Sequence, residues 1–314
     1  MSVRITAIDI GTNTILMLIA DLNDDGRIKT IKDEIAFPRL GRGVDESGVI
    51  SPESMDRVLS VLKDYRRTSG AAGSEKIIAC GTSALRDSRN RYEVLTRIRQ
   101  DALIDVEILS GEQEAQWTFL GALSGSPRSR GHFVVIDIGG GSTEITLGTQ
   151  NNVERRLSLD LGCVRLTERF LHSSPPTSEE LQRAMLSARA SFRRLGDIDA
   201  RTYRLVGVAG TITTLAALDQ DLSRFEPDKV DGYDLDIKKI KSIFEHLRAR
   251  TIDEIQSSPI VPAGRADILL AGTLVLLEFM TVHRFERIRV SKRGLRYGLV
   301  LREFERMKEH KKRR

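Results

Sequence analysis

Short apolar runs of β-strand character alternate along the chain with segments of helical periodicity. Strands are indicated within 5–20, 76–82, 133–148, 203–211 and 288–291, where Ile and Val are frequent and glycine or polar turn residues follow. The regular alternation of strands with helices predicts an α/β protein with mixed sheets.

The helical segments carry start signals. In SPESM (51–55), Ser51 is a plausible N-cap and Pro52 suits the first helical position. In the segment 110–123, Ser110 and Gln113 form a capping box, which predicts a helix that opens there. Further helices are expected at about 178–195, 211–218 and 266–280, and from about Leu295 to the C-terminus.

One strand–turn–strand unit occurs twice. Residues 5–20 read ITAIDIGTNTILMLIA and residues 133–148 read FVVIDIGGGSTEITLG, with Asp9 and Asp137 aligned. A single repeat at this spacing, in a chain of 314 residues, indicates two domains of similar topology. The turn-rich linker SGSPRSRG (124–131) suggests domains at 1–124 and 125–299.

Composition excludes several protein classes. With 40% hydrophobic and 30% charged residues, the chain is typical of a globular protein rather than a disordered or fibrous one. The most apolar segment, 268–280, is too short for a membrane span and contains Glu278. A signal sequence is not expected at the N-terminus, because Asp9 and Asn13 lie where it would need an apolar run, and two isolated cysteines predict no disulfide framework or zinc motif. We therefore expect a cytoplasmic protein with no membrane partner.

The basic residues are concentrated at one end. The net charge is +5, but residues 284–314 contain 13 basic and 4 acidic residues, which leaves the preceding part slightly acidic. Lys292, Arg293 and Arg296 follow a predicted strand, so they either attract a polyanion or form a solvated surface. The terminal KKRR (311–314) is interpreted as a solvated tail, and no nucleic-acid partner is expected from it alone.

Three glycine-containing turns predict phosphate binding. In Asp137-Ile-Gly-Gly-Gly-Ser-Thr-Glu144, glycines allow the backbone to approach a ligand and successive amides form an anion nest. The segment 9–14 is a less glycine-rich version, and the turn at 207–211 joins a strand to a helix N-terminus. The candidate phosphate-binding residues are Gly11, Thr12, Asn13, Thr14, Gly139, Gly140, Gly141, Ser142, Thr143, Gly210 and Thr211.

Carboxylates next to these turns predict a metal. Asp9 and Asp137 each end a strand just before a phosphate turn, where hard oxygen ligands suit Mg²⁺. The alternative is that each aspartate only caps its turn. Alternation along 143–148 places Glu144 on the polar side of its strand, either near the metal or simply exposed.

Two further charged groups are candidates for catalysis. Glu112 and Glu114 both lie in the first turn of the helix from Ser110, and either could act as a general base or merely favour the helix dipole. Arg86, in the polar segment 81–90 after a strand, is a candidate phosphate clamp or a surface ion pair.

Ordered motifs over nearly the whole chain resemble the exopolyphosphatase/guanosine pentaphosphate phosphohydrolase (Ppx/GppA) family. These motifs are IDIGTNT (8–14), GTSALRDSRN (81–90), ILSGEQEAQ (108–116), VIDIGGGSTE (135–144), LGCVRLTERF (161–170), GVAGTITTLAAL (207–218), RADILLAGTLVLLE (265–278) and VSKRGLRYGLV (290–300).

The resemblance implies two ribonuclease H-like domains of the actin-like ATPase superfamily flanking a cleft, with the C-terminal helix at about 300–314 packing on the first domain. It implies Mg²⁺-dependent hydrolysis, with Mn²⁺ as an alternative, of the terminal phosphoanhydride of inorganic polyphosphate or of the 5′ γ-phosphate of pppGpp. It assigns the general base to Glu114, the metal carboxylates to Asp137 and Glu144, and Asp9 to the first phosphate loop.

Three departures from the family pattern stand out. Gln116 replaces a usual arginine, Lys292 replaces an acid in the usual VSD, and Tyr297 replaces another acid. The last two predict a more basic entrance to the second domain. The chain also ends near 314, so the helical domain of longer members is not expected, and a homodimer stays an open option.

Two other functions share these motifs. An actin-like kinase or ATPase would use the same loops but need an adenosine pocket and an acceptor. A catalytically weak regulator that binds polyphosphate or guanosine penta- or tetraphosphate would keep the loops without turnover.

Overall fold

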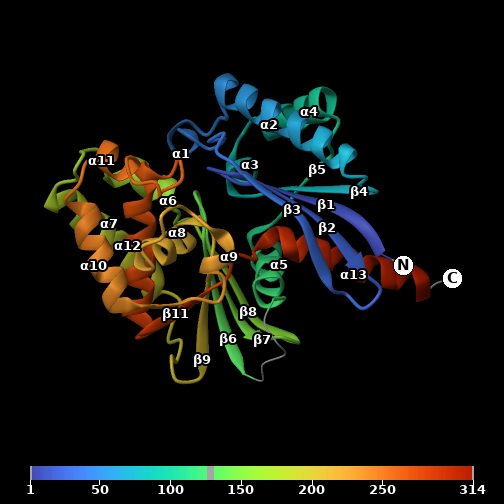
Figure 1. The fold of residues 1–314 in the computed structure, drawn as a ribbon. Helices are drawn as coiled ribbons and strands as arrows, with labels where there is room; N and C mark the ends of the chain where they lie inside the picture. The colour runs from blue at the N-terminus through green and yellow to red at the C-terminus, as the bar shows by residue number, and fades with distance from the viewer. Residues whose placement is uncertain (1, 126–130, 313–314) are drawn as a thin grey trace. The chain divides into compact units, whose positions relative to one another are not determined.

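The computed structural model describes residues 2–125 and 131–312, which form two compact units (Figure 1). Unit 1 comprises Met1–Gly125 and Arg293–Arg314, and unit 2 comprises Ser126–Lys292. The chain thus returns to unit 1 at Arg293, earlier than the boundary at 299 expected from the sequence. Most of the expected linker 124–131 and the last two residues of KKRR lie outside the described residues.

Unit 1 is built on a five-stranded sheet with the order β3-β2-β1-β4-β5. The strands are β1 (Ser2–Ile10), β2 (Ile15–Asn23), β3 (Ile28–Ala36), β4 (Lys76–Gly81) and β5 (Val106–Ile108). The first three strands pair antiparallel, while β4 joins β1 in parallel and β5 continues in parallel.

Helices cover the two faces of this sheet with separate apolar clusters. The helices are α1 (Val44–Ser47), α2 (Pro52–Ala71), α3 (Ser83–Asp87), α4 (Arg91–Ala102), α5 (Gly111–Leu123) and α13 (Leu295–Lys312). One cluster joins alternate residues of β1 and β2 to α2 and α4. The other joins the opposite face to α13, with Trp117 of α5 packed beside it.

Unit 2 contains a six-stranded sheet with the order β10-β11-β9-β6-β7-β8. The strands are β6 (His132–Ile138), β7 (Thr143–Thr149), β8 (Asn152–Leu159), β9 (Tyr203–Val208), β10 (Asp234–Asp236) and β11 (Arg287–Val290). The helices are α6 (Cys163–Phe170), α7 (Ser178–Arg193), α8 (Gly210–Asp219), α9 (Pro227–Val230), α10 (Ile237–Arg248), α11 (Ile252–Gln256) and α12 (Ala266–His283).

The two sheets confirm the internal repeat. The order β8-β7-β6-β9-β11 in unit 2 matches β3-β2-β1-β4-β5 in unit 1, with an antiparallel meander followed by parallel neighbours. The repeated Asp-Ile-Gly segments occupy the same central strands, β1 and β6. The repeated sequence segment therefore predicted the central strands and their duplication, whereas β3, β5, β8 and β10 were not predicted from the sequence.

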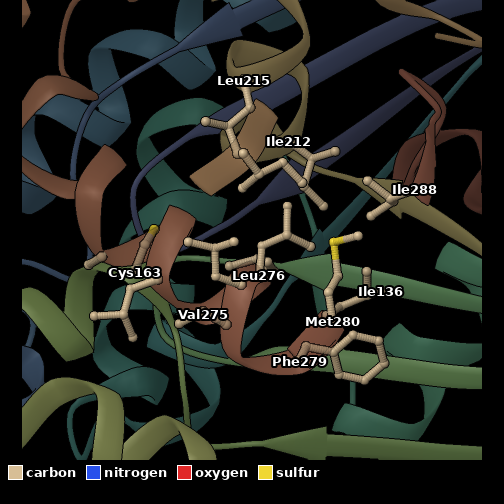
Figure 2. Close-up of a cluster of buried hydrophobic side chains, with 14 of the residues drawn as sticks. Ile136, Cys163, Ile212, Leu215, Val275, Leu276, Phe279, Met280 and Ile288 are labelled. Atoms are coloured by element: carbon tan, nitrogen blue, oxygen red, sulfur yellow. The ribbon is translucent and has the colours of Figure 1, made fainter. Parts of the chain in front are cut away.

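Helix α12 is the central helix of unit 2. Its side chains Val275, Leu276, Phe279 and Met280 pack among residues of β6, α6, α8 and β11 (Figure 2). By length and composition α12 would be long and apolar enough to cross a membrane, but 78% of it is buried inside the protein. It is therefore explained as a core helix. Its one acidic residue in the apolar stretch, Glu278, pairs with Arg189 at 2.7 Å.

Helix ends agree with the start signals in the sequence. The Ser51 hydroxyl accepts a hydrogen bond from the Ser54 amide, with Pro52 as the first helical residue of α2. Ser110 and Gln113 form the expected capping box of α5. These caps fix where α2 and α5 begin, because they satisfy amides that lack a partner in the first helical turn.

Candidate active site

The phosphate turn of unit 1 connects β1 to β2. The Gly11 amide donates to the Thr14 carbonyl at 2.9 Å, and a Cβ on Gly11 would lie only 3.0 Å from that carbonyl oxygen. The Thr12 carbonyl accepts from the Gly41 amide at 2.8 Å, and the Asn13 carbonyl accepts from Arg39 at 3.1 Å. These bonds hold the turn in one conformation, which favours a preformed ligand site.

The turn of unit 2 has the same geometry. The Gly139 amide donates to the Ser142 carbonyl at 3.0 Å, and a Cβ on Gly139 would lie 3.1 Å from it. The carbonyls of Gly139 and Gly140 accept from the first amides of α6, and Gly162 lets α6 approach, since a Cβ there would meet the Gly140 oxygen at 2.3 Å.

The amides of this turn remain available to an anion. In the described part of the chain, no hydrogen bond engages the amide of Gly140 or Gly141. Thr143, in contrast, donates its hydroxyl to the Leu161 carbonyl, so it is engaged within unit 2. Glycine amides next to a fixed turn are suited to form an anion nest, and phosphate binding at this turn stays a prediction.

The third turn lies between β9 and α8 and includes a buried charge that the sequence reasoning missed. Ala209 has a φ of 73°, and α8 begins at Gly210. The guanidinium of Arg265 lies against Gly210, where a Cβ would fall 1.7 Å from Nη1. Arg265 is only 6% exposed, and burial lowers its pKa, although arginine stays protonated in proteins. The one signal in the sequence that could have indicated this buried charge is the position of Arg265 just before the unusually apolar helix α12.

Thr211 adds a hydroxyl at the same place. Its Oγ1 is buried and has no hydrogen-bond partner among the described residues. Gly272 of α12 allows this close packing, since a Cβ there would lie 2.3 Å from the Thr211 oxygen. A buried cation and an unsatisfied hydroxyl at a helix N-terminus together suit a phosphate group.

Two carboxylates of unit 2 form a directly opposed pair. Asp137 of β6 and Glu144 of β7 are register partners in an antiparallel ladder, so their side chains lie on the same face. Glu144 is 2% exposed and accepts from the Ser158 hydroxyl at 2.7 Å. The expected alternation is confirmed, because Ile145 and Leu147 belong to the core on the other face. Plain exposure of Glu144 is therefore wrong.

Asp9 occupies the matching position in unit 1. It lies on β1 beside Cys80 of β4 and is half-buried, on the face whose neighbours Ile5 and Ala7 pack towards α13. The two strand-ending aspartates thus share one structural position in the repeat.

The carboxylates fit Mg²⁺ only as a partly hydrated ion. Within residues 2–125 and 131–312, no group of three or more His, Cys, Asp or Glu side chains is arranged to hold a metal. Mg²⁺, however, usually keeps several waters and takes one or two carboxylates together with substrate phosphates. The opposed pair Asp137 and Glu144 matches that requirement, whereas an ion such as Zn²⁺ would need a fuller protein ligand set.

The structure separates the two candidate bases. Glu112 is exposed, whereas Glu114 is 8% exposed and faces Arg86. Arg86 donates from Nη1 to Glu114 Oε2 at 2.9 Å and to the Leu109 carbonyl at 2.9 Å. Burial raises the pKa of Glu114, while the Arg86 charge opposes that rise. A carboxylate held in place with a raised pKa is suited to accept a proton near neutral pH.

Arg86 is thus engaged with Glu114, and its role as a phosphate clamp stays a prediction. The structure brings Glu114, Arg86, Asp9 and the turn at 11–14 into unit 1. The turn at 139–142, the pair Asp137 and Glu144, and the turn at 210–211 belong to unit 2.

Helix α5, which carries Glu114, packs very closely on α13. A Cβ on Gly121 would lie 2.2 Å from the Gly294 carbonyl oxygen, and a Cβ on Gly298 would lie 1.9 Å from the Trp117 carbonyl oxygen. Gly121 of α5 and Gly298 of α13 therefore set how closely the two helices approach.

The departures Tyr297 and Lys292 do not produce the basic entrance that the sequence suggested. Tyr297 is completely buried in unit 1, where its hydroxyl lies 3.0 Å from Thr30 Oγ1, so its placement in the second domain was wrong. Lys292 forms an ion pair with Asp228. Arg296 pairs with Asp33 at 2.8 Å. Acidic neighbours therefore neutralise much of this basic segment.

Comparison with known proteins identifies the family. The model of the "Ppx/GppA phosphatase family" matches residues 18–307. Exopolyphosphatase 2 of Mycobacterium tuberculosis is 35% identical over 320 residues, which cover 95% of this chain and 98% of that protein.

Solved structures similar to this chain include members of the same family. The Ppx/GppA family member of Aquifex aeolicus is 30% identical with a TM-score of 0.82, covering 98% of this chain and 99% of that one. An exopolyphosphatase from Cytophaga hutchinsonii is 28% identical with a TM-score of 0.88, covering 96% and 98%. The expected α/β fold with two repeated domains and the expected phosphoanhydride hydrolase are confirmed. The chain belongs to the Ppx/GppA phosphatase family.

Proposed function

We propose that this phosphatase removes the terminal phosphate of inorganic polyphosphate by direct attack of water, with Glu114 as the general base. The observation that carries the proposal is the buried Glu114 carboxylate, held 2.9 Å from Arg86 in a chain whose two units repeat one phosphate-binding turn. Polyphosphate is chosen over other phosphoanhydrides because related proteins, including that of M. tuberculosis, are named exopolyphosphatases. The γ-phosphate of pppGpp presents the same bond and is a second substrate for the same chemistry.

Glu114 takes the proton of the attacking water. As the water oxygen bonds to the terminal phosphorus, the bond to the bridging oxygen breaks, and the shortened polyphosphate leaves with that oxygen. The raised pKa makes Glu114 a better proton acceptor than an exposed glutamate, provided that it is ionised before the attack. Arg86 favours the ionised form and fixes one carboxylate oxygen, which leaves the other for water.

The glycine turns stabilise the phosphoryl oxygens. In unit 1 the amides of the turn at 11–14, and in unit 2 those of the turn at 139–142, are donors suited to phosphoryl oxygens, and the fixed geometry of each turn avoids reorganisation during transfer. Arg265 and the Thr211 hydroxyl provide a further cationic and donor group in unit 2. Asp137 and Glu144 would hold Mg²⁺, which, when bound, supplies positive charge to the phosphates.

We also place the protein in the cytoplasm. Cys80 and Cys163 are both buried and unpaired, which suits a reducing compartment.

The test is the pair of variants Glu114→Gln and Glu112→Gln. Both remove one charge from the first turn of α5, but only Glu114 is buried against Arg86. We expect Glu114→Gln to lower kcat for polyphosphate by about 10²-fold or more, the usual contribution of a general base, with polyphosphate binding retained. Glu112→Gln should behave as wild type.

Phosphate release is measured with polyphosphate and with pppGpp, each with Mg²⁺ and with EDTA. Full activity of Glu114→Gln would exclude Glu114 as the base. Tight binding of polyphosphate by the wild type without any phosphate release would point instead to a regulator.

A further inference from the structure

Unit 2 contains a pocket at the carboxyl end of α12. Its volume is about 660 Å³, and it is lined by the last turn of α7, the residues just after it and the end of α12. This volume lies within the range of about 300–1,000 Å³ that small-molecule sites usually have.

The pocket is separate from the phosphate turns. Helix α12 has 18 residues and therefore spans about 27 Å. Its first end adjoins Arg265, which lies against the Gly210 turn, and its last end reaches the pocket. A ligand in this pocket would thus not occupy the site that holds Thr211 and Gly210.

Two arginines of the pocket lack acidic partners. Arg189, a third arginine there, is bound by Glu278 through two hydrogen bonds of 2.7 and 3.1 Å. Arg193 and Arg284 have no ion-pair partner within the residues that the structure describes. Uncompensated positive charge in a concave site attracts anions.

The pocket also contains groups that an anion would not use. The His283 side chain is 5% exposed, and its Nε2 has no hydrogen-bond partner in the described chain. Burial lowers the pKa of His283, and its ring packs on Phe279 with the ring centroids 4.8 Å apart, so we assign no ligand contact to this side chain. Asp197 lines the same pocket, and a carboxylate accepts hydrogen bonds but repels phosphate.

The combination points to a ligand with two different ends. Arginines select a phosphate, while the Asp197 carboxylate selects hydroxyl or amino groups. A bare phosphate chain would place negative charge against Asp197. A phosphate ester of a small polar molecule avoids that repulsion, because its hydroxyl or amino groups can donate hydrogen bonds to the Asp197 carboxylate.

We propose that unit 2 carries a second ligand site in this pocket, which binds a small phosphate ester through Arg193 and Arg284, with its hydroxyl or amino groups at Asp197. The site goes beyond the proposed hydrolysis, because a phosphate monoester contains no phosphoanhydride bond.

The test is calorimetric titration of the full chain with three probes: glucose 6-phosphate, AMP and inorganic phosphate. The double variant Arg193→Gln with Arg284→Asn removes both cations. Asparagine suits position 284 because its φ of 61° is left-handed. Arg194→Gln is the matched control, since Arg194 is exposed on the same helix end but does not line the pocket.

We expect at least one ester to bind more tightly than inorganic phosphate. The double variant should weaken that binding by about tenfold or more, as expected for loss of charge-assisted bonds to phosphate, and Arg194→Gln should not. Binding of neither ester, or equal binding by the double variant, would overturn the proposal. Polyphosphate hydrolysis by the double variant without ester should equal that of wild type, so the outcome is independent of the Glu114 mechanism.

Discussion

The substitution Gly298→Ala should destabilise unit 1, although alanine is the better helix former. Gly298 lies inside α13, where replacing glycine by alanine gains about 1 kcal/mol of helix propensity. The added Cβ would stand 1.9 Å from the Trp117 carbonyl oxygen, whereas ordinary contact begins at 3.4 Å. The two helices would have to separate by the difference, 1.5 Å.

The size of the effect follows from what the Cβ meets. Overpacking usually costs about 1–3 kcal/mol, and the upper end applies here because backbone atoms cannot rotate away. Subtracting the propensity gain leaves a net loss of about 2 kcal/mol. Because Trp117 lies one helical turn after Glu114, the same displacement moves the base, and a shift of about 1 Å can lower kcat by roughly 10²-fold.

Urea unfolding followed by tryptophan fluorescence measures the loss directly. Trp117 is the only tryptophan in the sequence, and it lies at the contact that the new Cβ disturbs. Its fluorescence therefore reports on unit 1 without interference from unit 2.

Gly70→Ala provides the matched control. Gly70 is also helical, in α2, but a Cβ there meets nothing within 4 Å, so this variant should gain about 0.5–1 kcal/mol. Wild-type stability and emission for Gly298→Ala would refute the clash. Equal losses in both variants would show that the cost does not come from the α5–α13 contact.

Two pH-dependent predictions remain. Burial raises the pKa of Glu114 and the Arg86 charge opposes that rise, so Arg86→Ala should move the acid limb of the pH profile of kcat/KM for polyphosphate to higher pH. Arg86→Lys keeps a positive charge and should move it less. An acid limb that does not move would show that Arg86 does not control the pKa of the base. Hydrogen bonds from the amides of Thr177, His172 and Ser173 lower the pKa of Glu180 from 4.5 to about 2, so its stabilisation is complete above pH 4.5 and is lost as pH falls towards 2. Glu180→Gln should therefore be less stable than wild type at pH 7 in urea unfolding, with a difference that shrinks below pH 4.5; Glu179→Gln should show no such trend.

Local signals predicted the parts of the fold that local forces decide. The strand–turn–strand units were predictable because the strands are short apolar runs and each turn needs glycine where a Cβ would crowd a carbonyl, as at Gly11 and Gly139. The starts of α2 and α5 were predictable because Ser51 and Ser110 cap amides only three residues away.

Contacts between distant segments could not be predicted in the same way. Arg86 and Glu114 are 28 residues apart, and nothing in either motif shows that one side chain will hold the other. Arg265 reaches the Gly210 turn only because the packing of α12 brings it there. A buried charge in a folded site depends on which elements meet, and a hydrophobic pattern does not encode that choice.

The position of Tyr297 shows why the return of the chain to unit 1 at Arg293 matters for function. Tyr297 belongs to a basic segment and was expected near the ligand entrance. Its ring instead extends from α13 and is buried against the sheet of unit 1. Its neighbour Gly298 sets the distance from α13 to α5, and α5 carries Glu114. Substitutions around 294–298 therefore act on catalysis through the position of the base rather than through charge. Arg296→Gln changes only the charge there, so the salt dependence of polyphosphate binding should stay close to that of wild type. Gly298→Ala, in contrast, should lower kcat.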